Sequence, residues 1–471
     1  MHPEQPLAAV LETLWQIPPP GPSNLWSSPE FLALKTLLVQ RHRNGKSTFG
    51  VEIAIGNALK SLGLPCSTAH APYNQIPDFL EVAKSLSHEF ERTTTKRRYL
   101  CPLDLADDIP ELQFGNVRVG YFSASELEAL FEAPRLARCI PGDRLDAERL
   151  SKFHWLVVEE EVALGNTPHS RGFSFLDFRI DKDLGEIAPY SGRFPAVVEQ
   201  ALFFLLLAPW EDWAQMKEVD WRGFRLPWIY TLNDDLCAFP SPPPSPESLS
   251  WEPHFIQVGY DEWYESERPL RLQSFAGESD IRQALSHAKW TNFQAAKASD
   301  LFSTPVEHFM VRGFLGDGID EVMAHLILIE AAFGAENDHK RKLRPKTDRH
   351  NESPTRRVAA RLSAATGQPV VAKQYLALYD LRCTYIHGRA DDRVISTEQR
   401  VLARRLAREA ANAMVVLAQQ GKKREEVLAQ LLDQGVRNLP VDSNCFPKNP
   451  GPTAQGKTST SSGKGMKRQP T

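Results

Sequence analysis

Near its C-terminal end the chain reads Tyr375-Leu-Ala-Leu-Tyr379-Asp-Leu-Arg382-Cys-Thr-Tyr-Ile-His387-Gly388. Its apolar residues recur at the spacing of one helix face, which predicts an amphipathic helix that begins near Val370. Gly388 directly follows His387 and is the residue type that most often ends a helix. Arg382 and His387 would lie about 140° apart on a regular helix, so they can serve one site only where the helix ends.

The side chains of Arg382 and His387 match the needs of RNA cleavage. A histidine in the last turn faces the negative end of the helix dipole, which favours the protonated form that donates a proton near neutral pH. An arginine stays charged and offers a planar fork that fits a phosphate. When a ribose 2′-hydroxyl attacks phosphorus, these groups would transfer a proton and neutralise the phosphorane. A helix end with a surface arginine and no chemistry is the alternative explanation of the same spacing.

The segments around this helix also have helical patterns. Residues 317–333 are apolar on most sides, which predicts the central helix of a bundle that Gly334 ends. A charged loop, residues 335–352, follows, and Ser353-Pro354 then begins a helix that stops at Gly367. A further helix starts at Ser396, where Gln399 completes a capping box. The sequence therefore predicts an all-α domain over residues 280–438.

The order and spacing of these helices, together with Arg382-x4-His387, resemble the HEPN superfamily and most closely its ApeA-like group, over residues 317–420. The resemblance implies a homodimer in which each subunit supplies an arginine and a histidine to one cleft, and many relatives are endoribonucleases in phage defence or toxin systems. Arg382 and His387 match the catalytic pair. Active relatives often carry Asn, Asp or His where this chain has Cys383, a weak hydrogen-bond donor, and some relatives bind RNA or nucleotides without cutting.

Several residues near the motif are candidate supporting groups. Tyr385 would stack on a base or pack in the core, and Glu330 would hold Arg382 by an ion pair or form a structural salt bridge. The candidate RNA contacts are Arg400, Arg404, Arg405 and Arg408, which would form a basic stripe after the motif, and Lys340, Arg341 and Lys342 in the charged loop. The alternative for the stripe is a solvated helix face with ion pairs.

The rest of the chain predicts an α+β region with a β-rich middle. We expect an irregular N-terminus over residues 1–30 and an α+β sensor or regulatory region over residues 31–275, by analogy with ApeA-like proteins, that would respond to a phage or cellular trigger. Expected elements include a strand pair over residues 112–122 with a turn at Gly115-Asn116, strands at 155–158, 172–180 and 226–231, a helix at 195–207, a proline-rich connector at 239–247 and one aromatic strand at 255–264. The basic tail, residues 447–471, is expected to be disordered.

Composition narrows the possible functions. The net charge of −4 argues against a sequence-blind grip on nucleic acid over the whole surface. The six cysteines are scattered without a C-x-x-C pair, so we expect no zinc site, no disulfide scaffold and no cofactor. The longest apolar run, residues 201–208, is too short to span a membrane, and no secretory signal is visible, so we expect a cytoplasmic protein. The expected function is metal-independent RNA cleavage, and the alternatives are a non-catalytic RNA- or nucleotide-binding module and a dimerisation bundle.

Overall fold

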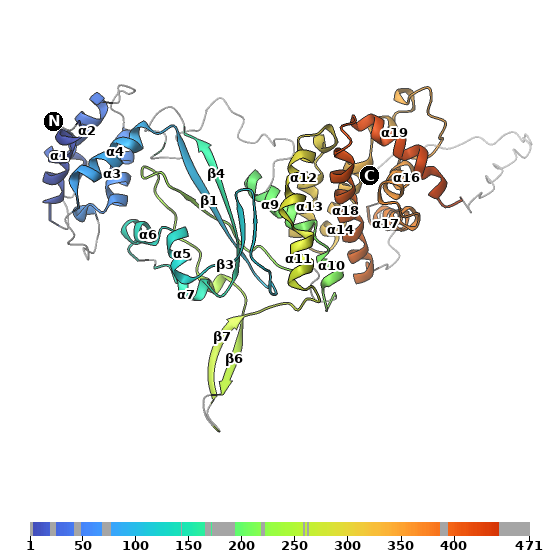
Figure 1. Cartoon of the computed structure of the whole chain (residues 1–471), viewed down its shortest axis with the longest axis horizontal. Helices are drawn as coiled ribbons and strands as arrows, with labels where there is room; N and C mark the ends of the chain where they lie inside the picture. Colours follow the sequence, from blue (N-terminus) through green and yellow to red (C-terminus); the bar gives the residue numbers. More distant parts are fainter. Residues whose placement is uncertain are drawn as a thin grey trace, which may run out of the picture.

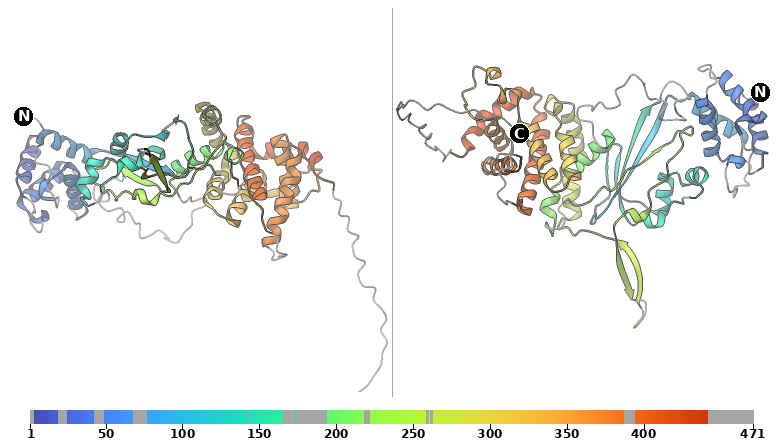
Figure 2. Two further views of the ribbon diagram at one scale, coloured as in Figure 1. Left: turned by 90° about the horizontal axis from the view of Figure 1, so that it is seen from below. Right: turned by 180° about the vertical axis from the view of Figure 1, so that it is seen from behind.

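The computed structural model describes residues 3–18, 25–41, 49–67, 77–142, 144–164, 171, 194–217, 222–257, 260, 263–386 and 394–441. These residues form three regions in a row along the long axis of the molecule (Figures 1 and 2): N-terminal helices, a central sheet with its own helices, and C-terminal helices. The expected strand at 172–180 and the tail at 447–471 lie outside the described residues. A mixed α/β fold with a β-rich middle and a helical C-terminal region confirms the coarse expectation.

The N-terminal region is a group of helices with a core of its own. It contains α1 (Gln5–Trp15), η1 (Leu25–Ser27), α2 (Pro29–Arg41), α3 (Phe49–Leu62), η2 (Pro65–Ser67) and α4 (Phe79–Glu91). The expectation of an irregular stretch over residues 1–30 is wrong for α1, where Leu7, Leu11 and Leu14 are buried at helical spacing. The proline in its first turn is compatible with a helix because no intrahelical hydrogen bond needs that N–H.

The central sheet has five antiparallel strands in the order β2-β3-β4-β1-β5. They are β1 (Thr94–Leu103), β2 (Leu112–Phe114), β3 (Val117–Tyr121), β4 (His154–Ala163) and β5 (Tyr230–Asn233). The turn at Gly115-Asn116 joins β2 to β3 as expected, and Gly115 takes the positive φ of 57° that favours glycine. The sequence did not predict β1, although it pairs with β4 over its whole length.

Helices cover both faces of the sheet. One face, which includes Leu100, Trp155 and Val157, packs on α5 (Ala124–Leu130), α6 (Ala133–Cys139) and α7 (Ala147–Leu150). The other face, with Tyr99 and Leu156, packs on α9 (Ala196–Leu206). This second core continues without a break into the C-terminal helices, so the sheet and the helical region share buried apolar residues.

The C-terminal region is built around α14 (Ile319–Phe333), which lies against α13, α16, α17 and α18. Before β5 the chain also forms α10 (Trp210–Trp213). After β5 the remaining helices and turns are η4 (Pro246–Ser248), α11 (Glu278–Ala284), α12 (His287–Lys297), η5 (Asp300–Ser303), α13 (Val306–Leu315), α15 (Glu336–His339), η6 (Arg341–Leu343), α16 (Pro354–Thr366), α17 (Val370–Ile386), α18 (Thr397–Ala418), α19 (Arg424–Gly435) and η7 (Val436–Asn438). The central apolar helix and the capping box at Ser396 are confirmed. Among the described residues, no helix combines the length and apolar character needed to cross a membrane.

Buried charges hold the charged loop against this bundle. Asp338 is 1% exposed and accepts hydrogen bonds from Arg357 (2.6 Å) and from Arg361 (2.9 Å) of α16. Arg357 also binds Asp348 farther along the same loop, at 2.5 Å. Because an unpaired buried charge is costly, these contacts fix both halves of the loop on α16.

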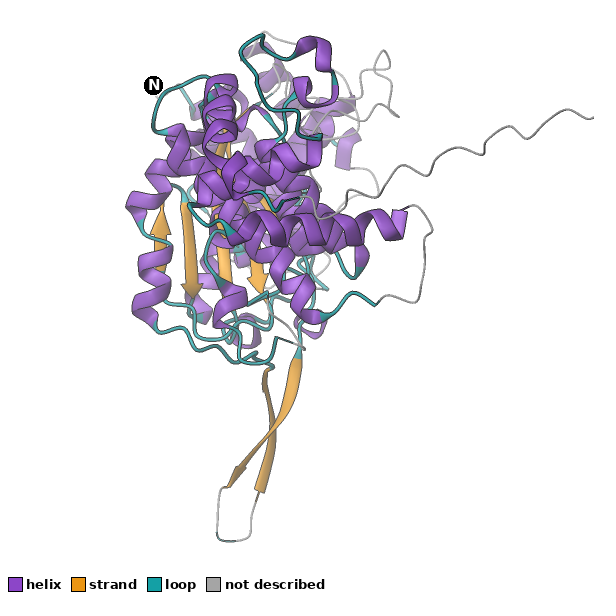
Figure 3. Ribbon diagram, turned by 90° about the vertical axis from the view of Figure 1, so that its right-hand side faces the viewer, coloured by secondary structure: helices purple, strands orange, loops and turns teal. Residues whose placement is uncertain are grey.

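A two-stranded hairpin projects from the sheet region (Figures 1 and 3). It consists of β6 (Trp251–Gln257) and β7 (Trp263–Pro269), paired antiparallel from Trp251↔Pro269 to Gln257↔Trp263. The expectation of one strand over residues 255–264 is therefore wrong, because that range includes parts of two strands. We call this hairpin the arm.

The contact between α16 and α19 gives a test of the fold. A Cβ added at Gly435 would lie 1.9 Å from the carbonyl oxygen of Ala360, whereas one at Gly142 would have no neighbour within 4 Å. We expect Gly435→Ala to lower the free energy of unfolding by about 2 kcal/mol or more, because a backbone must move to relieve the overlap. Gly142→Ala is the control, and denaturant unfolding is the measurement. Equal stability of the two variants would contradict this packing.

Candidate functional site

Arg382 lies in the last turn of α17, where the helix leaves the bundle. Its guanidinium carbon is 5.3 Å from the centre of the Tyr379 ring, and that ring lies 6.2 Å from the ring of buried Tyr375. The side chain of Arg382 is half-buried, and its Nε–H makes no hydrogen bond with any described residue. The Nε atom is buried, so an anion would meet this guanidinium through its terminal nitrogens.

Glu330 of α14 is the acidic group of this site. Burial raises the pKa of its carboxyl group, while the charges of Arg382 and His339 oppose that rise. The same carboxylate adds to the rise in the pKa of Tyr375, which burial causes first. No direct ion pair joins Glu330 to Arg382 in the described part of the chain, so the expected salt bridge is replaced by attraction at longer range. Glu330 thus lies between the end of α17 and the start of the charged loop.

Cys383 and Tyr385 follow Arg382 in the last turn of α17. Tyr385 is 42% exposed, so its expected alternative role in core packing is wrong, because this last turn extends past the neighbouring helices. Cys383 is half-buried, and it adds a small contribution to the rise in the pKa of Tyr375. His387 follows α17 directly in sequence but lies outside the described residues, so its distance from Arg382 is not part of this geometry.

The arginines of α18 do not form the expected phosphate track. Arg404 is 1% exposed and donates to the Leu206 carbonyl oxygen at 3.0 Å, and burial lowers its pKa to about 10. Arg408 binds Glu211 at 2.6 Å, and Arg400 binds Glu321 of α14 at 2.7 Å. Arg405 binds Asp212 of α10 at 2.5 Å. This stripe therefore joins α18 to α10 and α14, which corrects its interpretation as an RNA surface.

The three cations of the charged loop have a different environment. Lys340, Arg341 and Lys342 are all exposed. Lys340 pairs with Glu336 at 2.8 Å, whereas the side chains of Arg341 and Lys342 form no ion pair with any residue that the structure describes. They follow His339 in the chain. The charges of His339 and Arg382 both act on the carboxyl group of Glu330. Of the expected RNA contacts, these three cations are placed where a polyanion can reach them.

A buried polar cluster elsewhere was not predicted from the sequence. Glu89, Asp235 and Cys237 are the one group of possible metal ligands found among the described residues. The guanidinium of Arg171 donates to Asp235 at 2.6 and 2.8 Å and to Glu89 at 3.1 Å, so it supplies the positive charge there. Burial raises the pKa of the Cys237 thiol. The cluster therefore behaves as a structural tie between α4 and the segment after β5.

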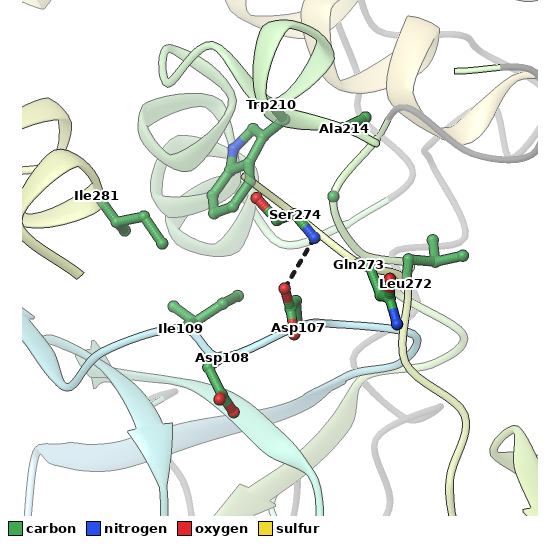
Figure 4. A pocket seen from close by; sticks show the side chains of 10 residues that line it. Asp107, Asp108, Ile109, Trp210, Ala214, Leu272, Gln273, Ser274 and Ile281 are labelled. Atoms are coloured by element: carbon green, nitrogen blue, oxygen red, sulfur yellow. Dashed lines mark hydrogen bonds between the residues drawn. The ribbon is translucent and has the colours of Figure 1, made fainter. Parts of the chain in front are cut away.

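Two hollows lie near the bundle and the sheet. The smaller, of about 20 Å³, is lined by Asp107, Trp210 and Ser274, and Figure 4 shows the Ser274 N–H donating to Asp107 at 2.8 Å. A cavity of this size holds little more than a water molecule. The larger pocket, of about 570 Å³, lies beside the charged loop and is lined by residues that include Leu343, Arg357 and Leu432.

The comparisons with known proteins add no family assignment. No protein-family model, no curated protein and no solved structure matches the chain.

The raised pKa of Glu330 predicts how stability depends on pH. Because the pKa of Glu330 in the folded protein lies above the ordinary value of 4.5, the folded protein holds the proton of this carboxyl group more tightly than the unfolded chain does. The stabilising contribution is complete below pH 4.5 and is lost as the pH rises through the raised pKa. We therefore expect the stability of the wild type relative to Glu330→Gln to fall from pH 4.5 towards neutral pH, measured by denaturant unfolding.

Glu336→Gln is the matched control for this measurement. Lys340 lowers the pKa of Glu336, so its contribution to stability is present above the ordinary value and is lost on acidification. If the stability of the wild type relative to Glu330→Gln instead rises with pH, attraction to Arg382 outweighs burial, and the environment described for Glu330 is contradicted.

Proposed function

We propose that this protein is an endoribonuclease of the HEPN type, which cleaves RNA without a metal ion through Arg382 and His387. The observation that carries the proposal is the setting of Arg382, a half-buried guanidinium held 5.3 Å from the centre of the Tyr379 ring near the end of α17. The exposed Tyr385 ring and the exposed cations at residues 340–342 give further support, because single-stranded RNA is bound by stacking and by charge.

The proposed reaction is an internal transfer at phosphorus. The ribose 2′-hydroxyl attacks the adjacent phosphorus and releases its proton to water, and the bond from phosphorus to the 5′-oxygen breaks. Arg382 stabilises the negative charge that develops on the phosphorane. A protonated His387 gives a proton to the departing 5′-oxygen. The products are one RNA with a 2′,3′-cyclic phosphate and one with a 5′-hydroxyl. Two copies of the chain would each supply an arginine and a histidine to the cleft.

The setting of the reaction is proposed by the same reasoning. The N-terminal helices and the sheet would sense a phage or cellular trigger and control the nuclease, as an element of phage defence or of a toxin system in the cytoplasm.

Cys383 favours a second candidate function, because a weak donor beside Arg382 suits a site that binds RNA or a nucleotide without cutting it. A dimerisation bundle with no ligand is the remaining alternative.

Cleavage of total cellular RNA in the presence of EDTA tests the catalytic pair. We expect the wild type to cut, and Arg382→Ala and His387→Ala each to lose about 100-fold or more in rate, as is usual when a general acid or a charge-stabilising group is removed. Lys373→Ala, an exposed cation on the same helix, is the control and should retain activity. If no protein cuts but the wild type binds RNA and Arg382→Ala does not, the binding-module alternative replaces cleavage.

Salt dependence of RNA binding tests the three exposed loop cations. The triple substitution of Lys340, Arg341 and Lys342 by alanine should weaken binding of single-stranded RNA. It should also reduce the slope of log affinity against log salt by about 2, because each released counterion contributes ~0.7. Lys289→Ala, an exposed cation on α12, should leave the slope unchanged. An unchanged slope in the triple variant would place the RNA elsewhere.

A further inference from the structure

The arm exposes large apolar side chains to solvent. The exposed fractions are 57% for Phe255, 45% for Ile256, 61% for Trp263 and 62% for Tyr264. These four residues gather in the outer half of the hairpin, away from the body of the molecule (Figures 1 and 3). Soluble proteins rarely expose such a group unless it meets another molecule.

The apolar residues lie on both faces of the arm. Residues directly opposite each other in an antiparallel pair share a face, and successive residues alternate. Ile256 opposes Tyr264, so these two lie on one face. Phe255 and Trp263 therefore lie on the other. A single flat surface cannot cover both faces, so the arm is shaped to enter a recess.

The base of the arm is held in place. The Trp251 ring lies 4.9 Å from the Phe153 ring, and the Arg149 guanidinium carbon is 4.4 Å from the Trp251 ring centre. Arg149 also binds Glu267 at 2.9 Å, and Pro269 is buried. Because its base is fixed, the arm loses little freedom on binding.

The charge of the arm limits its partner. Residues 251–269 contain five acidic residues and one arginine, a net charge of −4. Glu265, next to Tyr264, forms no ion pair with another described residue. This charge would repel RNA and anionic lipid, so the complementary surface must be cationic as well as apolar.

The same chain carries such a surface on its C-terminal region. Residues 340–349, which we call the basic segment, contain six cations and one acid, a net charge of +5. Leu343 in this segment is 52% exposed, and the pocket of about 570 Å³ beside it has an apolar lining from Leu343, Pro345, Leu428 and Leu432. Three arginines and four acids also line the pocket, so the excess positive charge lies on the basic segment at its edge and not inside it. The buried ion pairs of Arg357 with Asp338 and Asp348 fix the loop on α16, so the basic segment keeps one position.

The arm cannot reach the basic segment of its own chain. Asp348 of the segment binds Arg357 of α16, and Figure 1 places α16 at the right of the molecule, whereas the arm points down from the sheet. We propose that the arm of one copy docks on the basic segment and pocket of a second copy of this chain. Pairing of two arms with each other would bring like charges together and is disfavoured.

This contact does not depend on RNA cleavage, but it bears on RNA binding. Lys340, Arg341 and Lys342 belong both to the basic segment and to the candidate RNA contacts. The arm carries carboxylates and aromatic rings, and RNA carries phosphates and bases. Both therefore offer negative charge and flat rings to the same surface. The docked arm and RNA therefore compete for the same cations.

Sedimentation velocity of the full chain over a range of concentrations, without RNA, tests the proposal. We expect self-association that weakens at high salt, since exposed charges are then screened. Phe255→Ser combined with Trp263→Ser should weaken it, whereas Phe275→Ser, at a 73% exposed position outside the arm, should not. Association at high concentration that is unchanged by the arm substitutions would overturn the proposal, as would a monomer under all conditions.

Charge reversal identifies the surface that the arm meets. Glu265→Lys and Lys342→Glu should each weaken association by about tenfold, and the two combined in one chain should recover most of it. Lys289→Glu on α12 is the control and should leave association unchanged. If Glu265→Lys weakens association but Lys342→Glu does not, or if the combined chain shows no recovery, the arm meets a different surface and the proposal is wrong. Loss of RNase activity alone would not affect either result.

Discussion

The arrangement of the C-terminal region depends on carboxylates that are buried together with arginines. Glu321 of α14 and Glu211 of α10 are both 0% exposed, and each faces guanidinium groups of α18. An isolated charge in such a place would destabilise the fold by several kcal/mol. The three helices must therefore meet together, and this contact sets the direction of α14 and the position of Glu330 near Arg382. It also joins the helical region to α10, which lies between β4 and β5 in the chain.

The same contact decides which cations remain available for a ligand. The arginines of α18 satisfy buried acids and backbone carbonyls, so their charge is used within the fold. The loop after α14 is anchored through Asp338, which binds arginines of α16. The exposed cations of the loop are therefore not needed to neutralise a buried acid. The charged loop therefore keeps an exposed run of cations in a protein whose net charge is −4. The proposed RNA site and the proposed docking site for the arm both draw on that segment.

The sequence predicted elements whose signals are local. The apolar run of α14, the capping box at Ser396 and the turn at Gly115 each depend on residues within a few positions, and all three are confirmed. The role of Arg404 could not be predicted, because its contacts Glu211 and Leu206 lie nearly 200 positions away. Composition gave wrong predictions at the N-terminus and in the arm. The prolines suggested an irregular segment where α1 forms, and the aromatic run suggested one strand where the chain reverses between β6 and β7. The pairing of Arg382 with His387 stays a prediction.

The chemistry of the RNA ends tests the central claim most directly. Purified protein would be incubated with a defined RNA in the presence of EDTA, and the fragment masses would be measured by mass spectrometry. The account predicts fragments that end in a 2′,3′-cyclic phosphate, each with a partner that begins with a 5′-hydroxyl, because the 2′-oxygen is the nucleophile. Fragments with a 3′-hydroxyl and a 5′-phosphate, or cleavage that EDTA abolishes, would contradict it, because water activated by a metal would then be the nucleophile.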